Sequence, residues 1–79
     1  MEWRQYIHTD PNILVGKPVI KGTRLAVEFI LGLFAAGWTE QQVLDSYPTL
    51  SHESLQAVFA FSVEMLSQES WHSFADKVR

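Results

Sequence analysis

Residues 27–50, VEFILGLFAAGWTEQQVLDSYPTL, decide the fold of this chain. In the first part of this stretch, apolar residues recur at i, i+3, i+4 and i+7, which is the spacing of one helix face. These residues are Val27, Ile30, Leu31 and Phe34. Gly37 then stands where a left-handed residue commonly ends a helix. The stretch therefore predicts a helix that begins after Arg24 and ends before Gly37.

A second, short helix is predicted after Thr39. Thr39-Glu40-Gln41-Gln42 has the form of a capping box, in which Thr39 accepts from the third helical amide and Gln42 reaches back. Pro48 ends this helix, because the residue before a proline disfavours helical angles. Ser51 is a good cap for a third, longer helix. This order of helix, three-residue link, short helix, proline turn and longer helix is typical of a helix-turn-helix.

The third helix carries more apolar surface than two short helices can cover. One stripe combines Leu55, Val58, Phe59, Ser62 and Leu66, and Phe61 and Met65 fall on a neighbouring face. The aromatic residues Trp3, Trp38, Phe61, Trp71 and Phe74 exceed what so small a core holds comfortably. Together they predict an exposed patch that another chain covers.

The first quarter of the chain is expected to be extended. Strand-forming residues occur at 6–9, 13–15 and 19–20, separated by turn residues, which favours two or three short strands or a ribbon. The predicted fold class is mainly α, with three to four helices in a homeodomain-like or winged helix-turn-helix and a short N-terminal β ribbon. We divide the single domain, residues 1–79, into an extended basic arm (1–24), a helix-turn-helix core (25–66) and a C-terminal helix or tail (67–79).

Charge is distributed unevenly along the 79 residues. Residues 1–25 hold four basic residues against two acidic ones, and residues 26–79 hold two basic residues against seven acidic ones. A basic arm on an acidic body can attract an anionic partner to one face of the domain only. With no cysteine, a chain of this size can use neither disulfides nor a thiolate metal site, so oligomerisation or a partner is expected to help stabilise it. No signal peptide or membrane span is recognisable, which indicates a cytoplasmic domain.

The arm and the helices together resemble a known family. Asp10-Pro11 is followed by Gly16-Lys17-Pro18-Val19-Ile20-Lys21-Gly22-Thr23-Arg24, and later by Tyr47-Pro48 and Leu50 before the third helix. Over roughly residues 6–66 this pattern resembles the domain of unknown function 433. The resemblance implies a helix-turn-helix fold, a prokaryotic origin, and action as the antitoxin of a PIN-like nuclease toxin. Ala26 departs from the family pattern, in which proline often opens the first helix.

Two sets of residues are candidates for the site. Lys17, Lys21 and Arg24 could meet phosphates, and His52 and Gln56 on the third helix could read bases, so these five are the predicted DNA-binding residues. The third helix has no lysine or arginine, and a dimer would double the cationic contacts, so DNA binding is expected to need a homodimer or a toxin complex. The predicted partner-binding residues are Phe61, Met65, Trp71, Phe74 and Val78.

Two alternatives stay open at this stage. The acidic body and the uncharged third helix favour a protein–protein interaction module that never touches DNA. A small metal enzyme built on His8 and Asp10 is disfavoured, because metal sites usually show clustered ligands. Residues 16–23 do not form a phosphate-binding P-loop, since Lys21 precedes Gly22. The sequence therefore predicts no enzyme, cofactor, metal, membrane or small-molecule substrate for this chain.

Overall fold

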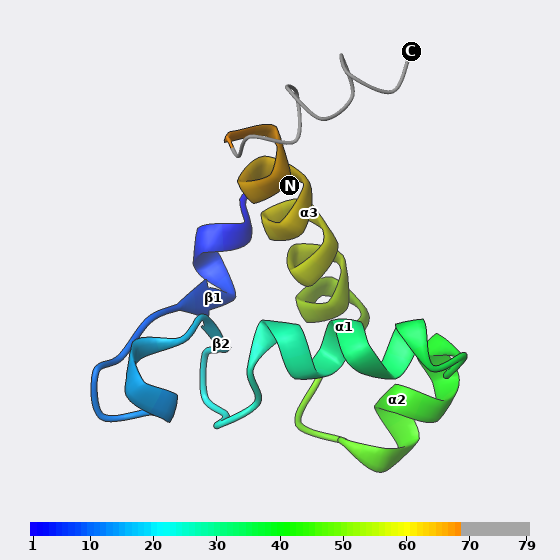
Figure 1. Cartoon of the computed structure of the whole chain (residues 1–79). Coiled ribbons are helices and arrows are strands. Elements are labelled where there is room, and N and C mark those ends of the chain that lie inside the picture. Colours follow the sequence, from blue (N-terminus) through cyan, green and yellow to red (C-terminus); the bar gives the residue numbers. More distant parts are fainter. Residues whose placement is uncertain (69–79) are drawn as a thin grey trace, which may run out of the picture.

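The computed structural model describes residues 1–68, which form three α-helices and a two-stranded antiparallel sheet (Figure 1). The elements follow in the order η1 (Trp3–Gln5), β1 (Ile7–His8), η2 (Leu14–Gly16), β2 (Val19–Ile20), α1 (Val27–Ala35), α2 (Glu40–Ser46) and α3 (His52–Gln68), where η marks a 3₁₀ turn. The predicted mainly helical class with a short N-terminal ribbon is confirmed. The predicted last helix or tail lies largely outside the described residues.

The sheet joins two strands of two residues each. In β1 and β2, Ile7 lies opposite Ile20 and His8 lies opposite Val19. Val19 also bridges to Ala26 on its other side, so the segment before α1 closes against the ribbon. The ribbon packs against the core through three buried side chains, those of Ile7, Val19 and Ile20.

The third strand, considered at residues 13–15, is not formed. The backbone amide of Asn12 donates to Oδ1 of Asp10 (2.9 Å), and the amide of Ile13 donates to the Asp10 carbonyl (2.9 Å). This Asx turn leads into η2, where Gly16 N donates to the Ile13 carbonyl (3.1 Å). The amide that a strand would pair with its neighbour is therefore used inside the turn.

The helix ends follow the predicted signals. Gly37 has φ +96°, the left-handed value expected after α1. At α2 the capping box is complete, since Gln42 N donates to Thr39 Oγ1 (3.1 Å) and Thr39 N donates to Gln42 Oε1 (2.8 Å). Ser51 caps α3 in the same reciprocal way with Ser54, at 3.1 and 2.9 Å. These local bonds satisfy amides that the helices leave free.

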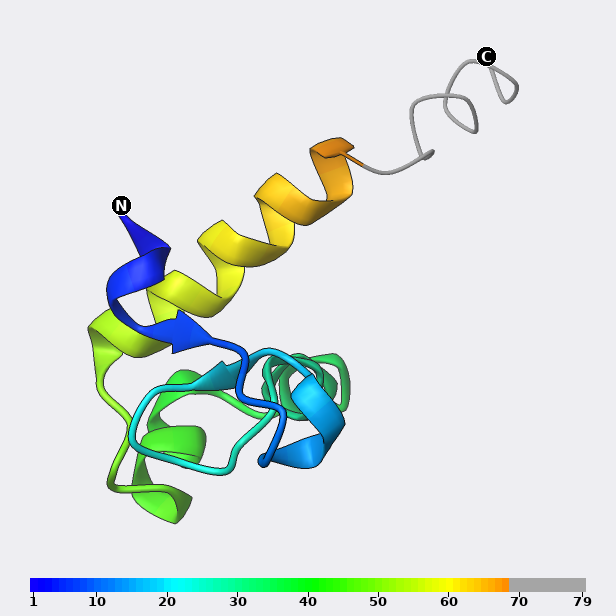
Figure 2. The same ribbon diagram turned by 90° about the vertical axis from the view of Figure 1, so that its left-hand side faces the viewer.

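The core lies where the ribbon, α1, α2 and the first half of α3 meet. Ile30, Val43 and Val58 are fully buried there, one from each helix. The second half of α3 runs away from α1 and α2, and η1 lies alongside it (Figures 1 and 2). Trp3 of η1 meets Phe61 edge to face at 4.8 Å, so the N-terminus is packed against the protruding part of α3.

The apolar stripe expected on α3 is divided by this packing. Leu55 and Val58 are buried, whereas Phe59 and Leu66 are 44% and 57% exposed. Phe61, from the neighbouring face, is half-buried because η1 covers that side of the helix. The aromatic excess is explained in part the same way, since Trp3, Trp38 and Phe61 all pack against the core rather than forming an open patch.

Candidate interaction surfaces

The basic arm presents fewer unpaired charges than its sequence suggests. Lys17 forms an ion pair with Glu28 of α1. Arg4 is paired with Glu2 (3.2 Å) and with Glu64 of α3 (3.1 Å). In residues 1–68, this leaves Lys21 and Arg24 as the lysine and arginine side chains that no ion pair neutralises. Both are exposed in the segment that joins β2 to α1, so this segment is the candidate anion-binding edge.

The start of α3 holds the two predicted base-reading residues. His52 and Gln56 are exposed and lie one helical turn apart. Nδ1 of His52 lies 2.5 Å from Oε1 of Glu40, so this ring is tied to the first turn of α2. Sequence reasoning missed this contact, which joins residues twelve apart. No hydrogen bond or ion pair in the described residues joins these side chains to Lys21 or Arg24, so the polar candidates fall into two separate groups.

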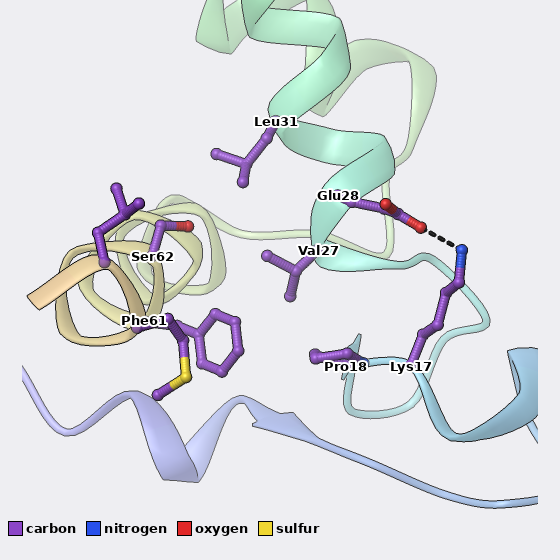
Figure 3. A pocket seen from close by; sticks show the side chains of 9 residues that line it. Lys17, Pro18, Val27, Glu28, Leu31, Phe61 and Ser62 are labelled. Carbon is purple, nitrogen blue, oxygen red and sulfur yellow. Dashed lines mark hydrogen bonds and ion pairs between the residues drawn. The ribbon is translucent and has the colours of Figure 1, made fainter. Parts of the chain in front are cut away.

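A groove lies between α1 and the protruding half of α3 (Figure 3). It has a volume of about 390 Å³ and is lined by Lys17, Pro18, Val27, Glu28, Leu31, Phe61, Ser62, Met65 and Leu66. Figure 3 shows Val27 and Leu31 facing the α3 side chains across the groove, with the Lys17–Glu28 ion pair at one side. The predicted partner-binding residues Phe61 and Met65 therefore share one apolar groove, while Trp71, Phe74 and Val78 lie outside the described residues.

An apolar ridge borders this groove on α3, and sequence reasoning did not single it out. Phe59, Val63 and Leu66 are 44%, 66% and 57% exposed and are spaced i, i+4 and i+7. That spacing places them on one face of the helix. The signal was present in the sequence, but the assignment of Phe59 and Leu66 to one stripe with the buried Leu55 and Val58 concealed it. We call Phe59, Val63 and Leu66 the α3 ridge.

A second exposed apolar feature is the loop at η2. Val15 is 95% exposed and Leu14 is 40% exposed, and both have positive φ, at +56° and +50°. Beside them a hollow of about 280 Å³ is lined by Leu14, Arg24, Leu25, Ala26 and Phe29. Non-glycine residues rarely adopt these angles, and a β-branched residue does so least of all. The loop is therefore held in a strained conformation.

The titratable groups of the described residues form no metal centre. In residues 1–68 no three histidine, aspartate or glutamate side chains gather closely enough to hold an ion. Oδ1 of Asp10 accepts from the backbone instead, as described above. Hydrogen bonds from the backbone and then the side chain of Arg4 lower the pKa of Glu2 below its ordinary value of 4.5. Among these helices none is long and apolar enough to cross a membrane.

These features define a small three-helix domain with a two-stranded sheet. The family model described as protein of unknown function (DUF433) matches residues 7–62, and the chain belongs to this family. A curated relative, the uncharacterized protein y4eO of Sinorhizobium fredii, is 34% identical over 53 residues, which are 67% of this chain and 24% of that protein. This chain thus matches about a quarter of that relative's length.

A solved structure has the same fold. The crystal structure of a DUF433 member protein from Anabaena variabilis superposes with a TM-score of 0.73 at 26% sequence identity. The match covers 78% of this chain and 61% of that one. The resemblance to this family over residues 6–66 is therefore confirmed, together with a mainly helical fold.

Proposed function

We propose that this chain is the antitoxin of a toxin–antitoxin pair, a helix-turn-helix protein that binds operator DNA as a dimer and neutralises a PIN-like nuclease toxin. The observation that carries the DNA-binding part is the α2–turn–α3 unit. Both of its helices are capped, and the first turns of α3 expose His52 and Gln56. Such a unit places the start of its second helix against base edges. The toxin-binding part is supported by the family resemblance and by the groove that contains Phe61 and Met65.

The ion pairs determine how many cationic side chains are free to contact DNA, and therefore how steeply binding should depend on salt. Because Lys17 is occupied by Glu28, each chain offers two unpaired cationic side chains, Lys21 and Arg24. The logarithm of the binding constant falls with the logarithm of salt concentration by about 0.9 for each neutralised phosphate. We expect a slope of about −3.6 for a dimer that uses four such contacts and about −1.8 for a single chain.

The test is fluorescence anisotropy with a duplex from the upstream region of the protein's own gene, titrated with salt and compared with a random duplex. We expect tighter binding to the upstream duplex, and a Lys21→Ala/Arg24→Ala variant that loses most of the affinity. Lys17→Ala is the matched control, since its charge is already paired with Glu28 and its loss should change the slope little. Absence of binding to either duplex at about 50 mM salt would contradict the proposal.

A second candidate function is a protein-interaction module without DNA binding. It is favoured by the absence of any lysine or arginine between residues 25 and 68, a region that holds five acidic residues. Phosphates would be repelled by such a surface. Under this function the Lys21→Ala/Arg24→Ala variant would bind its protein partner as tightly as the unmodified chain does, and neither duplex would bind. The Lys21→Ala/Arg24→Ala variant therefore distinguishes the two functions.

A further inference from the structure

We infer that the α3 ridge and the adjoining groove form the surface through which two copies of this chain associate, with their α3 helices antiparallel. This inference deepens the proposed function, because it names the interface of the proposed dimer. It begins from exposure: Phe59, Val63 and Leu66 are 44%, 66% and 57% exposed on one face of α3. The Phe59 ring also contacts Phe34 of α1, with ring centroids 5.1 Å apart, and beyond this contact α3 extends past α1 and α2 (Figure 1).

The charge on this surface suits a second copy. In a two-fold interface each patch meets its own duplicate, so a charged patch would repel itself. From Leu55 to Gln68, α3 contains one charged residue, Glu64. Its carboxylate points to η1, where Arg4 pairs with it at 3.1 Å. The ridge therefore meets its copy without bringing two like charges together.

The polar atoms within this surface are already satisfied. Oγ of Ser62, which lines the groove beside the ridge, donates to the Val58 carbonyl of its own helix (2.7 Å). A hydroxyl with such a bond can be buried without leaving an unmatched donor. Ser67 likewise donates to the Glu64 carbonyl (2.7 Å). The groove also carries Lys17 and Glu28 at one side, and these two side chains form an ion pair with each other, so neither charge needs a partner from the second copy.

The arrangement of ridge and groove allows two copies to pack against each other. Ridge and groove lie side by side on the same half of α3, and Leu66 belongs to both. When two copies meet about a two-fold axis, the ridge of each can enter the groove of the other, so that each contact occurs twice. The bulk of each domain lies at the α3 N-terminus (Figure 2), so a parallel pair would place both bodies at one end, whereas an antiparallel pair separates them.

The antiparallel arrangement has a consequence for the proposed function. If the axis passes between Ser62 and Val63, the rise of the helix separates the two His52 residues by about 32 Å. Half-sites of one operator are about 34 Å apart, which is one turn of DNA. The same pairing that covers the ridge would thus set the two α3 N-termini at the spacing of successive major grooves.

The test measures oligomeric state without DNA or toxin, so its result is independent of whether the chain binds DNA or neutralises a toxin. Light scattering after gel filtration should give twice the chain mass of 9.1 kDa for the unmodified protein. The Val63→Glu variant should give the single-chain mass over about 1–100 µM, the range that reports micromolar dissociation constants. Glutamate is well tolerated at an exposed helical position, and circular dichroism should show an unchanged fold.

The matched control is Val15→Glu, the same substitution at an apolar residue that is 95% exposed in η2. We expect it to remain a dimer. A single-chain mass for the unmodified protein would overturn the inference, and so would a Val63→Glu variant that stays dimeric. Equal loss of dimer in both variants would assign the effect to charge alone and would overturn it as well.

Orientation is tested by crosslinking, because the chain has no cysteine of its own. In an antiparallel pair Val63→Cys lies near the axis and should form a disulfide-linked dimer on oxidation. Phe59→Cys should not, since its mate lies about 10 Å farther along the pair. Efficient crosslinking of Phe59→Cys would instead indicate a parallel pair and would overturn the antiparallel arrangement, with Val15→Cys as the control for random collisions.

Discussion

Val15 is the residue at which a substitution should make this protein more stable. Its backbone has φ +56° and ψ +37°, and its side chain is 95% exposed, so it makes almost no contacts that a smaller residue would lose. An ordinary L-residue in this conformation costs about 1–2 kcal/mol, and glycine avoids that cost. Glycine in turn loses about 0.5–1 kcal/mol through the freedom of the unfolded chain. The Val15→Gly variant should therefore gain about 1 kcal/mol.

The assay is urea denaturation followed by circular dichroism, together with a thermal scan. For a domain of this size a gain of 1 kcal/mol raises Tm by about 4–8 °C. Val15→Ala is the control, because it removes the same methyl groups but keeps the Cβ that causes the strain. It should gain much less than Val15→Gly. A Val15→Gly variant no more stable than the unmodified chain, or a Val15→Ala variant with an equal gain, would refute the reasoning.

Three further predictions concern the rest of the fold. Thr39→Ala removes the capping box with Gln42 and should lower the free energy of unfolding by about 1 kcal/mol, whereas Thr39→Ser should retain it; urea midpoints compare the two. Ile30→Ala leaves a cavity at a fully buried position and should lower the free energy of unfolding by about 2–5 kcal/mol in the same assay. That is a large part of the total stability of a small domain. The folded state lowers the pKa of Glu2, so its bond to Arg4 stabilises the fold above pH 4.5 and is lost as the pH falls through the folded value. Glu2→Gln should remove this part of the pH dependence of stability. NMR titration of the Glu2 carboxyl in the unmodified chain gives the pH range in which it should occur.

The helix boundaries could be predicted because their signals are local. The capping box at Thr39 and the reciprocal cap at Ser51 each act within four residues, and the left-handed Gly37 ends α1 by its own backbone preference. The third strand considered at residues 13–15 does not form, and the reason is equally local. The Asp10 turn directs the following amides into η2, and this competition outweighed the strand preference of Ile13.

Which side of α3 is covered could not be predicted, because residues distant in the sequence decide it. Trp3 covers Phe61, and Arg4 pairs with Glu64 sixty residues away, so one side of the helix is closed by the N-terminus. A pattern read from the helix alone has no information about which of its faces η1 covers. Likewise the pairing of Lys17 with Glu28 depends on how the arm returns to α1, and this pair reduces the cationic group to Lys21 and Arg24.

The two ends of α3 make the proposed DNA binding and the inferred dimer depend on one another. Two cationic side chains per chain give weak binding with a shallow salt slope, and pairing through the ridge brings four to the same duplex. The Val63→Glu variant, altered far from the α3 N-terminus, should therefore change the salt slope for the upstream duplex from about −3.6 to about −1.8. Lys21→Ala/Arg24→Ala should abolish most of the slope but keep the dimer mass. If Val63→Glu becomes a single chain and the slope stays near that of the unmodified protein, DNA binding does not use the ridge-paired dimer, and the two proposals must be separated.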